Sequence, residues 1–406
     1  MLGLALEGGG AKGAFHMGAV KAFLEEGYNF DGVAGTSIGA LNGAIIAQGD
    51  FEMGYEWWER IDTSLLFDIE QSFMQKFMNK KIDRESLLYL YSKVKDVIEN
   101  RGLDTLKIRE TLKALIDEEK LRQSKVDFGM VTVSLSDFKP LELYKGDIPS
   151  GKLVDYLMAS ANLPVFKIEP LEGKFYIDGG FYDNCPVSLL AKKGYREVIA
   201  VRTMAIGRVR KVKDKDVKVT NIVPSDDLGR MLNFDNNVIH RNIKMGYCDA
   251  MRTIKGLKGT KYYIEPSSDD HLFFNSLLLI PEEAVIEAGK IMDLPQMEPK
   301  RMLFEKILPA LASALGLPAN STYKDIIIGV LENMAEQRRI ERLKIRKFGC
   351  FLEEIKAGRI EEKSISGSFT LKLAERAKLN LGFSKTVLLK RIGEELLKIL
   401  QSEQFN

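Results

Sequence analysis

A serine between two glycines, at the junction of an apolar stretch and a helix, constrains the fold of this chain more than any other feature. Ser37 is the centre of the pentapeptide 35–39 (sequence GTSIG), which follows the apolar pair Val33-Ala34 and precedes a helix-like stretch over 40–47. Glycines two residues either side of a serine let the chain turn sharply from a strand into a helix. Such a turn exposes the serine hydroxyl over the sheet edge, at the helix N-terminus. A short match of this kind is often only a turn, but the strand before it and the helix after it favour a reactive serine.

Apolar stretches with strand character alternate with helical patterns up to about residue 205. A buried strand is predicted at 2–6, and another just before the serine. Further strands are predicted over 126–135, 140–144, 174–178 and 197–203, and helices over 14–26, 153–161 and 187–193. The region from about 51 to 124 is mostly helical, with apolar residues at three-to-four spacing over 83–99 and 105–123. This alternation predicts a layered α/β domain with a largely parallel sheet.

The pattern changes near Pro281, after which helical signals dominate and strand signals are few. A chain of 406 residues has room for two or three domains. We therefore predict an α/β domain over 1–285 and a helix-rich C-terminal domain over 286–406, whose role the sequence does not indicate.

Composition argues against several classes of site and partner. The net charge of +2 gives no overall preference for nucleic acid, and we expect no such partner. The three cysteines are far apart and form no C-x-x-C motif, so we expect no disulfide framework, and no metal or cofactor. The apolar N-terminus lacks a basic start and stops at Glu7, which is too short for a signal peptide. No run approaches the roughly 18 apolar residues of a membrane span, and we expect a cytoplasmic protein.

A glycine-rich loop, Gly8–Gly13 (sequence GGGAKG), lies between the first predicted strand and the first predicted helix. Its spacing also fits a dinucleotide-binding loop, which needs an acidic residue at the carboxyl end of the next strand. Asp31 has about the right separation but precedes that strand. A P-loop would need serine or threonine after the lysine, whereas Lys12 is followed by glycine. The sequence therefore disfavours both kinds of nucleotide site.

The remaining role for this loop is the stabilisation of an anion by backbone N–H groups at the start of a helix. Beside a serine nucleophile, the N–H groups of Gly9 and Gly10 can bind the oxyanion of an acyl intermediate. Consecutive glycines also let a reacting carbonyl approach the backbone without a Cβ in the way. A plain tight turn is the alternative interpretation.

A serine nucleophile needs a base, and histidine is the usual partner. His240 and His271 do not follow clean strands, and His16 falls within the first predicted helix. Asp178 is better placed, because it ends a predicted strand and precedes two glycines. We expect the carboxyl ends of parallel strands to bring it to the same crevice as Ser37. A carboxylate becomes an adequate base where burial raises its pKa. The alternative is an aspartate that only caps a turn.

Together these three elements resemble the patatin-like phospholipase family, which is related to the cytosolic phospholipase A2 catalytic domain. The resemblance rests on the glycine loop 8–13, the serine pentapeptide 35–39 and Asp178-Gly179-Gly180, in the family's order and with similar spacing. Segments 159–166 and 184–186 also look like the family. The resemblance covers residues 1–205 well and 206–285 loosely, and the C-terminal third matches no module.

The resemblance implies a three-layer α/β/α fold and hydrolysis of fatty-acyl esters, such as phospholipids, by a phospholipase A or lysophospholipase type of carboxylic ester hydrolase. It implies a dyad in which Ser37 is the nucleophile and Asp178 the base, with Gly9 and Gly10 as oxyanion donors. By the same resemblance Lys12 supports the loop. The other motif residues are Gly8, Ala11, Gly13, Gly35, Gly39, Gly179 and Gly180. Glu7 stands where many members have aspartate, which we do not expect to affect the dyad.

Two other functions remain open. The same acyl-enzyme would serve an acyltransferase, in which an alcohol replaces water. A non-catalytic lipid-binding module with a vestigial dyad is a third interpretation, which the intact Ser37, Asp178 and glycine loop disfavour.

Two basic segments are candidates for peripheral contact with the inner membrane surface. Segment 208–218 interleaves basic and apolar residues and is otherwise a solvated loop or hairpin. Segment 338–348 has six basic residues against one acidic and is predicted as a basic amphipathic helix, either on a membrane or packed with one charged face. Trp57-Trp58 is expected to fill the core or to line an acyl pocket.

Overall fold

The computed structural model describes residues 1–62, 66, 104–167, 169–266, 270–358 and 380–401. It divides into two compact units, Met1–Thr253 and Ile254–Asn406. The predicted boundary at 285/286 is therefore too late. The reason is that Tyr262, Phe273 and Leu277 are buried in the hydrophobic core of the second unit, together with the helices that follow them.

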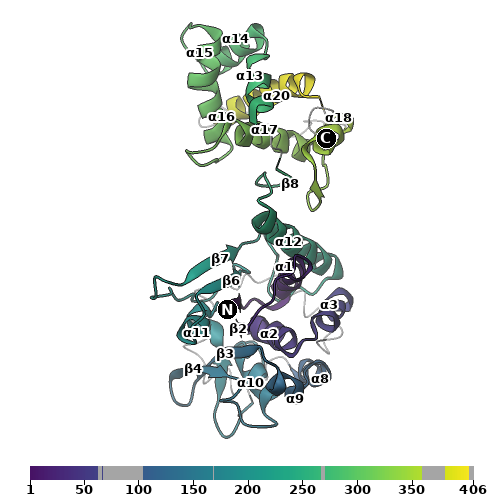
Figure 1. Ribbon diagram of the computed structural model, residues 1–406, viewed down its shortest axis with the longest axis vertical. Coiled ribbons are helices and arrows are strands. Elements are labelled where there is room, and N and C mark those ends of the chain that lie inside the picture. The colour runs from purple at the N-terminus through teal and green to yellow at the C-terminus, as the bar shows by residue number, and fades with distance from the viewer. Residues whose placement is uncertain (63–65, 67–103, 168, 267–269, 359–379, 402–406) are drawn as a thin grey trace, which may run out of the picture. The chain divides into compact units, whose positions relative to one another are not determined.

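The first unit is built on a mainly parallel sheet with the strand order β4-β3-β2-β1-β6-β7, and a further strand, β5, also pairs with β3 (Figure 1). Its strands are β1 (Leu2–Leu6), β2 (Gly32–Thr36), β3 (Asp127–Ser134), β4 (Lys139–Tyr144), β5 (Tyr176–Asp178), β6 (Glu197–Val201) and β7 (Lys218–Ile222). Strands β3, β2, β1, β6 and β7 run parallel to one another. Strands β4 and β5 pair with β3 in the antiparallel sense. The predicted strands are all present, and the largely parallel sheet is confirmed.

Helices cover both faces of this sheet. They are α1 (Ala14–Glu25), α2 (Ile38–Gln48), α3 (Phe51–Arg60), α8 (Leu106–Leu115), α9 (Glu118–Gln123), α10 (Leu153–Ser160), α11 (Val187–Lys192) and α12 (Asn236–Lys255). Alternate residues of β1 face opposite layers: Ala5 lies in a cluster with α11, whereas Leu6 approaches Gly43 of α2. The predicted three-layer α/β/α arrangement is confirmed. The stretch 105–123, predicted as one helix, forms α8 and α9 with a break at residues 116–117, and the predicted helix 83–99 lies outside the described residues.

The second unit is mostly helical, as predicted for the C-terminal region. Its elements are β8 (Tyr263–Ile264), α13 (Asp270–Leu278), α14 (Glu282–Ile291), α15 (Pro299–Met302), a π-helical turn (Leu303–Ile307), α16 (Leu308–Ala314), α17 (Tyr323–Gln337), β9 (Ile345–Arg346), α18 (Phe348–Ala357) and α20 (Asn380–Ile399). Ile327 and Leu331 of α17 are fully buried at its centre, in one cluster with Leu388 and Ile392 of α20.

The predicted amphipathic helix over 338–348 is wrong. Helix α17 ends at Gln337, and Arg339 has a left-handed backbone with φ 55°, which a continuing helix cannot contain. The chain then forms β9, in which Arg346 is 4% exposed and pairs with Glu354 at 3.0 Å. This segment is a packed loop and strand with a buried cation.

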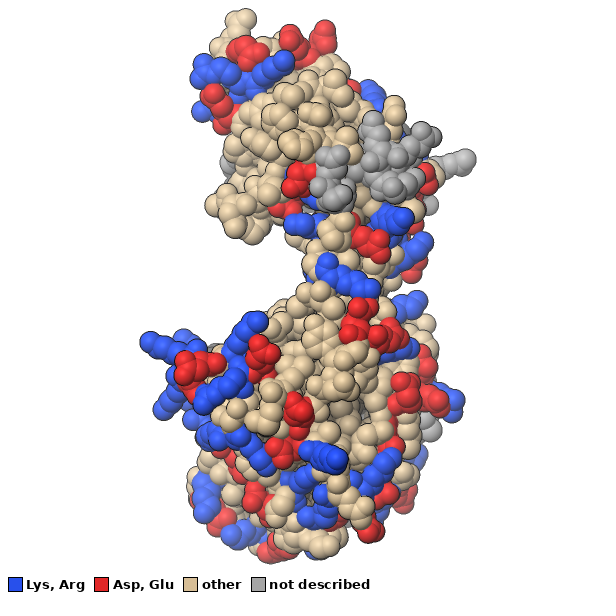
Figure 2. Space-filling view, in the orientation of Figure 1, with Lys and Arg blue, Asp and Glu red and all other residues tan. Residues whose placement is uncertain are grey.

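No helix in the part of the chain that the structure describes is long and apolar enough to cross a membrane. Figure 2 shows basic and acidic side chains interspersed over the visible face of the first unit, in keeping with the net charge of +2.

Candidate active site

Ser37 occupies the sharp turn between β2 and α2. Its backbone is left-handed, with φ 56° and ψ −129°, which is uncommon for a residue with a side chain and stores about 1–3 kcal/mol of strain. The flanking glycines are required by close backbone packing. A Cβ on Gly35 would lie 2.1 Å from the Gly39 carbonyl oxygen, and one on Gly39 would lie 2.2 Å from the Leu6 carbonyl oxygen. The predicted strand–turn–helix context of the serine is therefore present.

Ser160, at the end of α10, holds this turn. The Ser37 N–H donates to Ser160 Oγ at 3.0 Å, and the Ser160 hydroxyl donates to the Val131 carbonyl of β3 at 2.7 Å. Sequence reasoning gave Ser160 no role. A fully buried serine at the end of a mainly apolar helix is the signal, but burial cannot be read from the sequence.

Asp178 meets Ser37 because β2 and β5 lie end to end along one edge of β3. Thr36, the last residue of β2, pairs with Val131, and Asp178, the last residue of β5, pairs with the next residue, Thr132. The other edge of β3 is occupied by β4 over residues 129–134. The expectation that Asp178 ends a parallel strand is therefore wrong. It reaches the serine because β5 runs antiparallel toward the end of β2.

The environment of the Asp178 carboxyl favours its neutral form. One oxygen, Oδ1, accepts a hydrogen bond from the Gly180 N–H at 2.7 Å, whereas Oδ2 has no partner among the described residues. Complete burial raises the pKa of this carboxyl from 3.8 to about 6, against the lowering effects of the Ser37 hydroxyl and the Gly180 N–H. The hydroxyl is close enough to influence this pKa but does not reach the geometry of a regular hydrogen bond.

The glycine loop lies directly against Ser37. A Cβ on Gly8 would lie 3.2 Å from the Ser37 Cβ, and Gly10 lines the same pocket as Ser37. The N–H of Gly8 donates to the Asn184 carbonyl at 2.9 Å, and that of Ala11 to the Met231 carbonyl at 2.7 Å. Between them, the N–H groups of Gly9 and Gly10 have no recorded partner among the described residues.

Glycine is needed at both central positions of this loop. Gly9 and Gly10 have φ values of 156° and 57°. A Cβ on Gly9 would lie 2.7 Å from Thr203 Oγ1, and one on Gly10 would lie 2.2 Å from the Met231 carbonyl oxygen. Lys12 closes the loop through its N–H, which donates to the Gly9 carbonyl at 3.2 Å.

A buried ion pair holds the segment that follows β6 against the loop. Glu7 is 1% exposed, pairs with Arg202 at 3.0 Å and accepts the Thr203 N–H at 2.7 Å. The Thr203 hydroxyl donates in turn to the Gly8 carbonyl. Arg202 and Thr203 were not predicted as site residues, because nothing in their sequence pattern points to the loop.

The three histidines lie elsewhere. His16 is buried in α1 beside the Asn42 amide, and burial lowers its pKa to about 3, so it stays neutral. His240 on α12 contacts the Glu59 carbonyl at 2.8 Å, and His271 belongs to the second unit. None of the three is among the described residues that line the pocket at Ser37. Asp31 precedes β2 at the end opposite the glycine loop, which leaves the dinucleotide interpretation without its acidic residue.

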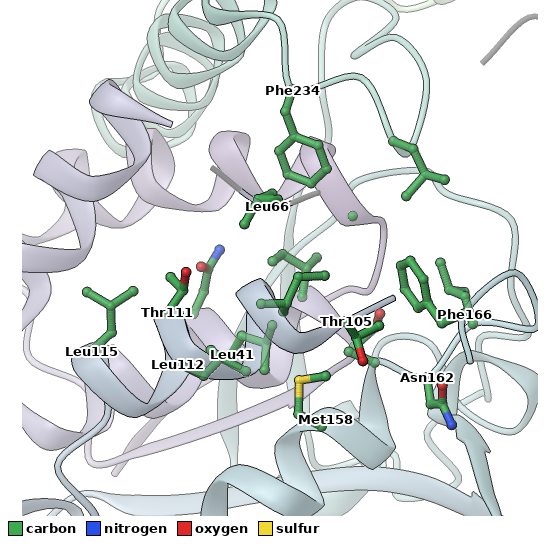
Figure 3. Close-up of a pocket in the computed structure, with 18 of the residues that line it drawn as sticks. Leu41, Leu66, Thr105, Thr111, Leu112, Leu115, Met158, Asn162, Phe166 and Phe234 are labelled. Carbon is green, nitrogen blue, oxygen red and sulfur yellow. The ribbon is translucent and has the colours of Figure 1, made fainter. Parts of the chain in front are cut away.

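The pocket at Ser37 has about 830 Å³ of empty space and a mainly apolar lining (Figure 3). Leu41 and Ile45 of α2 lie four and eight residues beyond the serine, which is about 6 and 12 Å further along the helix. Other lining residues are Gly10, Ile38, Asn42, Trp57, Leu66, Thr105, Ile108, Thr111, Leu112, Leu115, Met158, Ala161, Asn162, Leu163, Phe166, Leu232 and Phe234. Trp57 is thus part of the pocket wall, whereas Trp58 is fully buried and donates to Asn42 Oδ1 at 2.9 Å.

Comparison with known proteins gives the same assignment as the motifs. The family model for patatin-like phospholipases matches residues 4–191, which include the glycine loop, Ser37 and Asp178. This chain belongs to the patatin-like phospholipase family.

Three relatives of this patatin-like chain illustrate the range of the similarity. A patatin-like phospholipase domain-containing protein of Caenorhabditis elegans, ZK370.4, is 25% identical over 276 residues, which are 65% of this chain and 18% of that protein. Lysophospholipase NTE1 of Mycosarcoma maydis is 30% identical over 203 residues, 49% of this chain and 9% of its own. The uncharacterized protein YqhO of Bacillus subtilis is 30% identical over 218 residues, 51% of this chain and 72% of its own. The patatin-like chain thus spans less than a fifth of the first two relatives.

Proposed function

We propose that this protein is a serine-dependent lipid acyl hydrolase of the phospholipase A or lysophospholipase type. Ser37 is the nucleophile, Asp178 the general base, and the N–H groups of Gly9 and Gly10 stabilise the oxyanion. The observation that carries the proposal is the buried carboxyl of Asp178, which lies where β5 meets the strained Ser37 turn, beside an apolar pocket. One oxygen of this carboxyl has no partner among the described residues, and its pKa is raised to about 6. Family membership supports a lipid substrate.

In this mechanism the ionised Asp178 takes the Ser37 hydroxyl proton as the oxygen attacks the ester carbonyl. Negative charge develops on the carbonyl oxygen, which the N–H groups of Gly9 and Gly10 bind. Asp178 then gives the proton to the leaving alcohol. It later takes a proton from the water that attacks the acyl-serine and returns it to the Ser37 oxygen as the fatty acid leaves. The Gly180 N–H fixes Oδ1, which leaves Oδ2 free for these transfers.

The apolar pocket is the proposed site of the acyl chain. Burial of methylene groups against its aliphatic and aromatic lining stabilises the complex by about 0.8 kcal/mol per group. The face of α2 from Ser37 to Ile45 is about 12 Å long, which matches the extended length of about ten bonded carbons.

We further propose that membrane contact occurs through an exposed loop over residues 204–215, hereafter the interfacial loop, and not through 338–348. Its apolar side chains Met204, Ile206 and Val209 are 57%, 39% and 38% exposed. Its exposed basic side chains are Arg208, Lys211, Lys213 and Lys215. Exposed apolar and basic side chains together favour an anionic membrane surface.

The interfacial loop starts beside the dyad. The Arg208 N–H donates to the Gly180 carbonyl at 2.9 Å, and the Asn184 N–H donates to the Arg208 carbonyl at 2.6 Å. A lipid reached through this loop would therefore enter close to Asp178. The predicted cytoplasmic location stays a prediction.

The deciding experiment combines covalent labelling with product analysis. A fluorophosphonate probe should label the wild type and not Ser37→Ala, whereas the exposed Ser150→Ala control should be labelled normally. Incubation with phospholipid and lysophospholipid panels should release free fatty acid, detected by mass spectrometry. Transfer of the acyl group to an added alcohol in place of its release would identify an acyltransferase. Labelling that persists in Ser37→Ala would place the nucleophile elsewhere.

A further inference from the structure

A second, polar pocket adjoins the apolar one. It has about 840 Å³ of empty space and shares Thr105, Met158 and Asn162 with the lining of the apolar pocket. Its other lining residues are Arg109, Lys152, Asp155, Ala159, Lys167, Glu169, Pro170, Leu171, Glu172 and Tyr176. Three cations and three anions are among them, so the lining is neutral overall.

Residues in and next to the wall between the two pockets also hydrogen-bond to the backbone of Ser37 and Asp178. The Asn162 carbonyl accepts the Asp178 N–H at 2.9 Å, and α10 presents Met158 to both pockets and Ser160 to the Ser37 N–H. Figure 3 shows Asn162 at the end of the apolar pocket opposite Leu115, with Met158 between them. A lipid whose ester lies at Ser37 therefore has one pocket for its acyl chain and another for its polar end.

One side of the polar pocket has excess positive charge. Arg109 of α8 and Lys152 share a single carboxylate, that of Asp155, with the lysine at 3.5 Å. Arg109 is only 26% exposed, which strengthens its interaction with an anion relative to a surface cation. A phosphodiester would complete the charge balance on this side.

Another part of the same pocket has excess negative charge. Glu172 accepts a hydrogen bond from the Tyr156 hydroxyl at 3.2 Å, and among the described residues no cation pairs with it. Glu172 is also strained: it has φ 51° and forms a two-residue turn with Gly173, a position that favours asparagine or glycine. Tyr176 lines the same pocket.

We propose that this polar pocket, the headgroup pocket, binds the zwitterionic headgroup of a phospholipid such as phosphatidylcholine or phosphatidylethanolamine. The phosphate lies near Arg109 and Lys152 and makes charge-assisted hydrogen bonds. The ammonium group lies near Glu172 and over the ring of Tyr176. The neutral lining disfavours a headgroup with a net negative charge. The inference rests on the proposed function for the position of the ester at Ser37.

Binding to the Ser37→Ala variant tests this without turnover. Calorimetric titration with monomeric dihexanoyl phosphatidylcholine and phosphatidylethanolamine should give affinities roughly tenfold higher than with dihexanoyl phosphatidylglycerol and phosphatidic acid. Glycerophosphocholine, which has the headgroup alone, should bind much more weakly than the lipid, since it lacks the acyl chains.

Charge-neutral variants assign the two sides of the pocket. In the Ser37→Ala background, Glu172→Gln should weaken binding of the two zwitterionic lipids roughly fivefold and leave phosphatidylglycerol unchanged. Lys152→Gln should weaken binding of all four lipids, because each contains the phosphate. Glu110→Gln removes an exposed carboxylate from α8 outside the pocket lining and should change nothing.

Equal affinity for zwitterionic and anionic lipids, or a Glu172→Gln effect no larger than that of Glu110→Gln, would overturn the headgroup assignment. Wild-type protein that releases fatty acid from all four lipids at equal rates would also overturn it and leave the hydrolase proposal standing. The reverse result, zwitterion-selective binding without fatty-acid release from any ester, would support the headgroup pocket and overturn the hydrolase proposal.

Discussion

Asp178→Asn should make the first unit more stable relative to the wild type as the pH rises, while it strongly lowers turnover. The rise in the pKa of the buried carboxyl from 3.8 to about 6 corresponds to about 3 kcal/mol that the folded state loses when the group is ionised. Because the folded pKa is the higher one, the folded state holds the proton more tightly. The stability contributed by protonated Asp178 is fully present below about pH 4 and is lost as the pH rises through about 6.

Asparagine suits this position sterically. Its Oδ1 can keep the hydrogen bond from Gly180, and its amide nitrogen replaces Oδ2, which has no partner among the described residues. An unpartnered buried amide costs about 1–3 kcal/mol, but this cost does not change with pH. The quantity to compare is therefore the difference in the free energy of unfolding between variant and wild type. It should grow in favour of the variant by about 2 kcal/mol between pH 4 and pH 7, because the unfolded chain already ionises Asp178 in part at pH 4.

Urea unfolding followed by tryptophan fluorescence measures the stability of the first unit, which contains Asp178. The chain has two tryptophans, Trp57 and Trp58, and both lie in α3 of the first unit. Burial also raises the pKa of Asp183 to about 6, but Asp183 is present in both proteins, so its contribution cancels. Exposed Asp216→Asn controls for the loss of one negative charge. A stability difference that stays constant from pH 4 to pH 7 would refute the buried, raised-pKa carboxyl and with it the proposed base.

Four further outcomes follow from the same geometry. Because Asp178 must be ionised to accept a proton, kcat/KM for a soluble acyl ester should rise with pH through about 6 and at pH 5 should be about a tenth of its plateau. Activity that is undiminished at pH 5 would contradict a base with this pKa. Asp178→Asn should lower turnover about 10²–10⁴-fold, whereas His240→Gln and His271→Gln should stay within about threefold of wild type; loss of activity in a folded histidine variant would indicate a triad. Ile45→Trp fills the pocket about 12 Å from Ser37, so kcat/KM should fall about tenfold or more for long-chain esters and little for short-chain ones. An equal loss for both kinds of ester would place the acyl chain outside this pocket. Replacing the three lysines of the interfacial loop with glutamine should weaken binding to anionic vesicles by up to about 1 kcal/mol per charge, while hydrolysis of a soluble ester stays unchanged. If vesicle binding responds neither to salt nor to these substitutions, the loop does not contact the membrane.

The sheet and the serine turn could be predicted because each depends on local constraints. Strand-length apolar stretches alternate with helical patterns, and Gly35 and Gly39 stand where the backbone passes within about 2 Å of a Cβ position. Glycine at such positions is dictated by sterics, so the spacing around Ser37 indicates the turn directly. The same holds for the loop at Gly9 and Gly10, which no other residue type fits.

Features that depend on distant contacts could not be predicted. The three residues of β5 are too few to show a direction, and the direction is set by the free edge of β3 beyond Thr36. Segment 338–348 has a helical distribution of basic and apolar residues, but pairing of Ile345 with Tyr263 forms a strand there instead. The polar pocket combines residues from 105 to 176 whose charges have no shared sequence pattern.

The proposed site occupies a break in the backbone ladder of the sheet, and this explains how a reactive carboxyl is kept dry and unpartnered. Where β2 and β5 both end, backbone groups along the edge of β3 lose their strand partners, and buried groups of this kind must find substitutes. Side chains at the end of α10 and on β3 supply them. Ser160 bridges the Ser37 N–H and the Val131 carbonyl, and the Thr132 hydroxyl lies 3.0 and 3.1 Å from the Ala159 and Ile177 carbonyls. These hydroxyls satisfy the backbone, and Asp178 Oδ2 is left without a partner among the described residues, near the hydroxyl that the strained Ser37 turn presents to it.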